Sequence, residues 1–170
     1  MRFPDGPHER AALRETDLTT RASARAGLAG LRFDRTGWEP EVTDPAWVLP
    51  PIWLRFGLSV RLREACLTRL AQRRAGDTPL LQQQMVKGQL ADIAIGHLET
   101  GTTLAAFDDG ASDLATMLDV NHRITGIDTD LLNLLGAAGY LSDGPGQAAY
   151  VSELITDLYL PRPTLDGIDA

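Results

Sequence analysis

The chain has 170 residues, 44% hydrophobic and 23% charged, a composition that suits one soluble globular domain or one domain with an arm. Its formal net charge is −7, which would repel a phosphate backbone, so no nucleic-acid partner is expected. No apolar run approaches the roughly 20 residues that cross a bilayer, and the N-terminus has no apolar signal core. We therefore expect a cytoplasmic protein that contacts no membrane.

Residues 1–45 differ from the rest because glycine and proline interrupt them repeatedly. Within them, residues 28–33 carry alternating apolar side chains at Leu31 and Phe33, the pattern of one short β-strand. One isolated strand is not stable alone. We therefore predict an extended arm over 1–45, whose short strand lies on the body, pairs with another chain or stays extended without a sheet.

Apolar residues then recur at helical spacing, and the first two helices follow from their terminal signals. The first helix is predicted from Pro51 to about Arg74, because a proline in the first turn loses no hydrogen bond. The second is predicted to begin with Thr78 as N-cap and Pro79 as the first helical residue. It ends near residue 101 or continues to 107.

The third and fourth helices are set by similar signals. The third is predicted from Ser112, a candidate N-cap, to the break at Gly136–Gly139. The fourth covers about 147–158. Four amphipathic helices with short breaks favour an antiparallel bundle. We therefore predict an all-α fold with an antiparallel four-helix bundle over 46–161, the extended N-terminal arm before it and a flexible tail over 162–170.

Composition and spacing point to no common catalytic or metal motif. Asp119 and His122 lie at i, i+3 on one helix face, but a di-iron bundle needs this pair twice and no second copy exists. We therefore predict no metal site. Cys66 follows the apolar pattern and is predicted to be a small buried core residue. No nucleophile elbow and no phosphate-binding loop is present.

Four segments stand out by their order and intervals. Residues 73–80 read Arg-Arg-Ala-Gly-Asp-Thr-Pro-Leu, residues 84–93 read Gln-Met-Val-Lys-Gly-Gln-Leu-Ala-Asp-Ile, residues 133–140 read Asn-Leu-Leu-Gly-Ala-Ala-Gly-Tyr, and residues 158–161 read Leu-Tyr-Leu-Pro. Their succession resembles the C-terminal helical domain of the acyl-CoA dehydrogenase family. The resemblance covers the whole predicted bundle.

The resemblance implies an FAD-associated oxidoreductase and names candidate cofactor contacts. The family's flavin-phosphate arginine corresponds to Arg73 or Arg74, and we take Arg73 as the candidate. Asn133 stands where the family has glutamine, and Gly136 and Gly139 belong to its glycine-rich break. These residues would bind FAD through phosphate and backbone contacts.

The resemblance also identifies where the catalytic base should be. In many members a glutamate directly after an Ile-Tyr element removes the α-proton of an acyl thioester. Leu160 occupies that position here, and leucine cannot accept a proton. Other members carry the base on the first helix of this domain. Glu64 is the only acidic residue of that predicted helix, so it is the catalytic candidate; a solvated ion pair with Arg61 or Arg63 is the alternative.

By this resemblance, the family's N-terminal and middle domains have no counterpart in the chain apart from residues 21–40, which are similar to the last strand of the middle domain. The resemblance therefore implies a subunit or fragment that needs a partner, as a homodimer or as a heteromer with a dehydrogenase-like subunit, with FAD shared or lost. Two alternatives stay open. The bundle could be a flavin-independent biosynthetic enzyme of the cyclase or dehydratase type, acting on an acyl or polyketide-like substrate. It could also be a non-catalytic scaffold.

Overall fold

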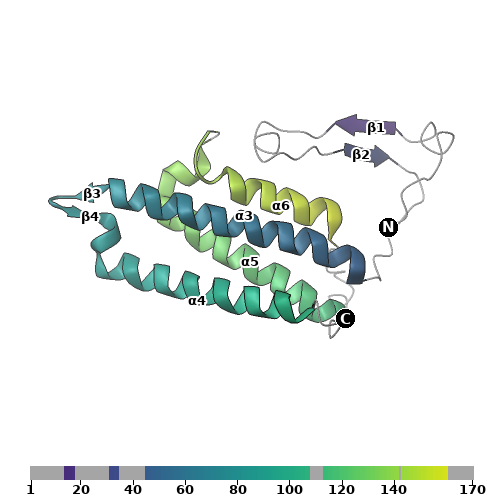
Figure 1. Cartoon of the computed structure of the whole chain (residues 1–170). Coiled ribbons are helices and arrows are strands. Elements are labelled where there is room, and N and C mark those ends of the chain that lie inside the picture. Colours follow the sequence, from purple (N-terminus) through teal and green to yellow (C-terminus); the bar gives the residue numbers. More distant parts are fainter. Residues whose placement is uncertain (1–13, 18–30, 35–44, 108–112, 142, 161–170) are drawn as a thin grey trace, which may run out of the picture.

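The computed structural model describes residues 14–17, 31–34, 45–107, 113–141 and 143–160, and there the chain is mostly helical (Figure 1). Four long helices make up most of the described part: α3 (Pro45–Gln72), α4 (Gln84–Phe107), α5 (Leu114–Leu135) and α6 (Gln147–Tyr159). No helix in these ranges is long and apolar enough to cross a membrane. The expected tail over 162–170 and most of the expected arm lie outside the described residues.

Two short strands pair near the N-terminus. β1 (Arg14–Asp17) and β2 (Leu31–Asp34) run antiparallel, with Arg14 opposite Asp34 and Asp17 opposite Leu31. The sequence pattern predicts a single strand over about 28–33. The apolar alternation of β2 accounts for that expectation, whereas β1 reads Arg-Glu-Thr-Asp and has no such alternation to reveal it.

Helix α3 begins earlier than predicted. It starts at Pro45 and holds Pro50 and Pro51 inside, so the predicted start at Pro51 is wrong. Two prolines inside a helix each remove one backbone hydrogen bond. Tertiary packing offsets that loss, because Val48 and Ile52, one turn apart, are both fully buried.

The connection from α3 to α4 also differs from the prediction. A hairpin of β3 (Arg74–Ala75) and β4 (Thr78–Pro79) precedes the 3₁₀ turn η1 (Leu80–Gln82), and α4 begins only after that turn. The predicted N-cap at Thr78 is therefore wrong. The backbone N–H of Leu80 donates to the carbonyl of Arg73 at 2.8 Å, which keeps this segment in a hairpin instead of a first helical turn.

The ends of α5 follow side-chain and backbone signals. Asp113 is its N-cap, and its carboxylate accepts a hydrogen bond from the backbone N–H of Thr116 at 2.7 Å. The predicted cap, Ser112, lies outside the described residues. The predicted stop at Gly136 is confirmed, because this residue has φ 57° after the last turn. The 3₁₀ turn η2 (Gly136–Tyr140) follows, and α6 begins at the predicted residue.

Helix α3 packs against α5, α6 and α4, and α4 also packs against α5. Two large apolar clusters, and a small third one of Leu58, Val151 and Ile155, fill the space between the helices. The first contains Val48, Ile52, Leu104, Phe107, Met117, Val120, Ile124 and Leu160. The second contains Leu62, Cys66, Leu70, Ile93, Ile127, Leu131, Leu135 and Ala149, so the predicted burial of the cysteine is confirmed.

Between the clusters lies a layer of buried polar residues, which we call the polar layer: Arg55, Ser59, His97, Thr100, Asn121, Asp128 and Ser152.

The turn between η2 and α6 depends on a close backbone approach. A Cβ atom added at Gly146 would collide with the carbonyl oxygen of Gly139, a backbone atom that cannot swing away. Only glycine therefore allows the first turn of α6 to lie this near to η2. Both glycines also line a pocket between α5 and α6.

We expect Gly146→Ala to destabilise the fold by about 1–3 kcal/mol, because the added methyl group forces the backbone apart. Gly126→Ala is the matched control. Gly126 lies exposed inside α5 with nothing within 4 Å of an added Cβ, so this change should stabilise the helix by about 1 kcal/mol. Urea unfolding of both variants measures the difference. Equal effects of the two substitutions would contradict the close approach.

Candidate functional site

The guanidinium of Arg55, on α3, is the centre of the polar layer and is 0% exposed. Its Nη1 donates to the backbone oxygen of Asn121 at 3.1 Å and also to the side-chain oxygen of that residue. Its other nitrogens donate to Ser152 Oγ at 3.0 Å, Thr125 Oγ1 at 2.8 Å and Glu153 Oε1 at 3.2 Å. One side chain of α3 therefore joins α5 to α6.

Carboxylates balance the buried charge of Arg55. Burial lowers the pKa of Arg55, whereas the charges of Glu153 and Asp128 raise it. A guanidinium stays protonated in proteins, so Arg55 carries its positive charge inside the fold. Glu153 pairs with Arg55 directly from a half-exposed position. Asp128 makes no such direct pair among the described residues.

Asp128, on α5, is a buried carboxyl that lacks hydrogen-bond partners. It is 3% exposed, and neither carboxyl oxygen has a partner in the described part of the chain. Burial raises the pKa of Asp128; the hydroxyls of Ser59 and Ser152 and the charge of Arg55 lower it in part, although no hydroxyl reaches hydrogen-bond geometry. The group can therefore hold a proton at a higher pH than an exposed aspartate.

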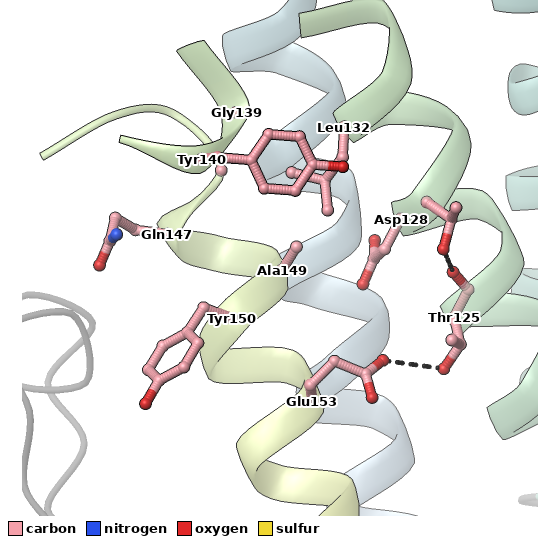
Figure 2. Close-up of a pocket in the computed structure, with 11 residues that line it drawn as sticks. Thr125, Asp128, Leu132, Gly139, Tyr140, Gln147, Ala149, Tyr150 and Glu153 are labelled. Carbon is pink, nitrogen blue, oxygen red and sulfur yellow. Dashed lines mark hydrogen bonds between the residues drawn. The ribbon is translucent and has the colours of Figure 1, made fainter. Parts of the chain in front are cut away.

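A pocket of about 350 Å³ opens between α5, η2 and α6, and Asp128 lines it. Figure 2 shows the carboxyl groups of Asp128 and Glu153 in the space between the two helices, with Glu153 bonded to Thr125. Tyr140 and Leu132 also line the pocket, and the side chain of Tyr140 is exposed. A pocket with a small number of polar groups on an apolar wall is typical of a small-molecule site.

The polar layer continues toward α4 through a buried histidine. Ser59 Oγ lies 2.9 Å from His97 Nε2, and Arg63 Nη1 lies 3.4 Å from His97 Nδ1. Burial, and then the positive charge of Arg63, lower the pKa of His97 to about 4. The ring is therefore neutral near pH 7, and it links α4 to α3 without adding a charge to the layer.

The candidate residues from the sequence analysis fall in different places. Glu64 is exposed on α3, and its backbone oxygen accepts from the hydroxyl of Thr68. Arg73 and Asn133 are exposed, and Gly136 caps α5. Gly139 is buried and lines the pocket. Of these five candidates, the structure brings only Gly139 into the pocket.

Sequence reasoning missed Arg55 and Asp128, although a signal for each was present. Asp128 follows Ile124 by four residues and precedes Leu131 by three, so it sits on the apolar stripe of its helix. Arg55 follows Ile52 by three residues on the stripe of α3 in the same way. A charged residue at a core-facing position is rare unless it is paired or functional.

Within the described residues, no group of three or more His, Cys, Asp and Glu side chains could hold a metal ion. Asp119 bonds to Arg123 at 3.1 Å, and His122 is exposed. The chain matches no model of a known protein family and no curated protein. Function must therefore be argued from the residues themselves.

We expect Arg55→Ala to cost about 3–5 kcal/mol of folding stability, because it leaves Glu153, Asn121 and Ser152 without their donor. Arg61→Ala on the same helix removes an exposed arginine and should change stability by about 0.5 kcal/mol or less. Arg55→Lys keeps the charge but loses the planar, five-donor guanidinium, so its stability cost should lie between those of Arg55→Ala and Arg61→Ala. Chemical unfolding gives the three values. Similar costs for Arg55→Ala and Arg61→Ala would contradict the central role of Arg55.

Proposed function

We propose that this chain is an acyl-CoA dehydrogenase-like subunit or fragment, a cytoplasmic antiparallel four-helix bundle of the family's C-terminal type that associates with FAD in an assembly. The placement of the family-like segments supports the proposal. Residues 84–93 form the first turns of α4, and residues 133–140 form the end of α5 and η2. The segment that begins at Leu158 ends α6. Three of the four family-like segments therefore lie at the start or the end of a helix.

The observation that carries the proposal is the outer face of α4. Met85, Ile95 and Leu98 are 81%, 55% and 72% exposed. At helical spacing, the centre of this face contains no charged residue; it consists of Gly88, Ala91, Ile95, Leu98, Thr102 and Ala106. A helix on the surface of a monomer normally turns a polar face to water. An uncharged outer face therefore suits a helix that a partner subunit covers.

The two positions at which the family carries its catalytic base also favour dependence on a partner. Leu160, at the family's usual base position, is buried in the first apolar cluster. Glu64 lies exposed and outside the pocket. We therefore propose that a dehydrogenase-like partner subunit, or a second copy of the chain, completes the site that takes the acyl thioester.

The exposed candidates are compatible with a cofactor held between subunits. The C-terminal ends of α3 and α5 lie at the same end of the molecule (Figure 1). Arg73 and Asn133, which are both exposed, therefore sit at one end of the fold, where a flavin phosphate bound by a partner could reach them. One helical unit supplies only part of such a contact set, so the chain alone should bind FAD weakly.

The first measurement is the absorption spectrum of the purified chain, followed by titration with FAD. We expect a flavin signal that depends on assembly and that Arg73→Ala weakens by about tenfold, the effect of one lost contact of ~1.4 kcal/mol. Arg61→Ala, which removes an exposed arginine outside the family-like segments, is the control. Absence of binding at high micromolar FAD, alone and with a dehydrogenase-like partner, would reject the flavin part of the proposal.

We expect Leu98→Glu to weaken self-association or partner binding by about 100-fold, because it places a charge in the covered face of α4. Gln89→Glu adds the same charge to an exposed position off that face and should have little effect. Sedimentation equilibrium gives the association constant, and thermal unfolding checks that both variants stay folded. Equal association of the two variants would show that this face is not an interface.

A second function is favoured by one specific observation, the position of Asp128 in the pocket. A carboxyl with a raised pKa can act as an acid or base. The chain would then be a flavin-independent enzyme of the cyclase or dehydratase type on an acyl or polyketide-like substrate. Turnover that needs Asp128, but needs neither flavin nor an unaltered outer face of α4, would favour this function over the first. A scaffold would show neither turnover nor flavin binding.

A further inference from the structure

The pocket between α5 and α6 contains an unsatisfied buried acceptor. Asp128 is more than nine-tenths buried, yet neither of its oxygens has a hydrogen-bond partner in the described residues. Buried carboxyl groups are almost always paired or hydrogen-bonded, because the loss of solvation is otherwise uncompensated. Since Asp128 lines the pocket, a ligand there can supply the missing partner.

The charges around the pocket define the kind of ligand. The charged or ionisable lining residues are Asp128, Glu153, Tyr140 and Tyr150, and no Lys, Arg or His is among the lining residues. Arg55 is not a lining residue, and its guanidinium pairs with the lining residue Glu153. An anionic ligand would therefore meet carboxylates and no cation, whereas a cationic ligand would meet a carboxylate that has no direct partner.

We propose that this pocket binds a small protonated amine, with Asp128 as the counter-ion and Tyr140 at the mouth. An ammonium group carries three donors and can satisfy both the carboxyl of Asp128 and the hydroxyl of Thr125 or Thr129, which line the same wall. The face of a tyrosine ring also attracts a cation. The inference goes beyond the proposed function, and its test needs neither flavin nor a partner subunit.

The experiment uses three probes of one shape and different charge: cyclohexylmethylamine, cyclohexylmethanol and cyclohexanecarboxylate. Binding to the full chain is followed by ¹H–¹⁵N chemical shifts, which also locate the site. We expect the amine to bind at least about tenfold more tightly than the alcohol, a difference of ~1.4 kcal/mol, and the carboxylate to bind least. Equal binding of amine and alcohol would overturn the proposal and point to a neutral substrate.

Two variants test the role of the carboxylate. Asp128→Asn keeps the shape of the side chain and removes its charge, so the amine should lose about tenfold or more in affinity while the alcohol is unaffected. Asp130→Asn removes an exposed carboxylate from the same helix and should leave both affinities unchanged. Equal losses in the two variants, or shifts outside the α5–α6 pocket, would overturn the proposal.

The pH dependence gives an independent readout in the unmodified chain. Arg55 and Glu153 are the charged groups that act on Asp128, with the hydroxyls of Ser59 and Ser152 beside it. Because the amine stays protonated, its affinity should rise as pH increases through the raised pKa of Asp128 and then level off. An affinity that does not rise over this range, or no binding of the amine at any pH, would overturn the proposal even if Asp128→Asn failed to fold.

Discussion

The packing of the helices depends on one buried cation, Arg55. Its side chain donates to groups on both α5 and α6, and a guanidinium offers its donors only in one rigid plane. A slide of α6 along α3 would break these bonds while the apolar contacts could reform in another register. The buried charge therefore contributes more to the choice of one arrangement than to net stability.

Much of the fold could be predicted from the sequence because three of its signals are local. The positive φ of Gly136, the apolar stripe of α5 and the start of α6 at Gln147 depend on nearby residues alone. The misplaced starts of α3 and α4 have a different cause. There, long-range packing of Val48 and a backbone bond between Leu80 and Arg73 overrode the local preferences of proline and threonine.

The pocket could be predicted far less well than the fold. Asp128 and Glu153 are 25 positions apart and meet only when α5 and α6 pack, so no motif spacing links them. A resemblance to a family can point only to residues within the matched motifs. Asp128 and Glu153 both lie outside the matched segments. The sequence does show that Asp128 is a carboxyl residue on the apolar stripe of its helix. That pattern identifies an unusual position, but it does not indicate that Glu153 lies nearby.

The two surfaces on which the functional proposals rest can operate together. The uncharged face of α4 points outward from one side of the fold, whereas the pocket is lined by α5, η2, α6 and the residue before it, with no contribution from α4. A partner that covered α4 would therefore leave Asp128 reachable by a small molecule. The polar layer connects the two regions, because His97 on α4 lies 2.9 Å from Ser59 on α3, and Ser59 is one of the groups that act on Asp128.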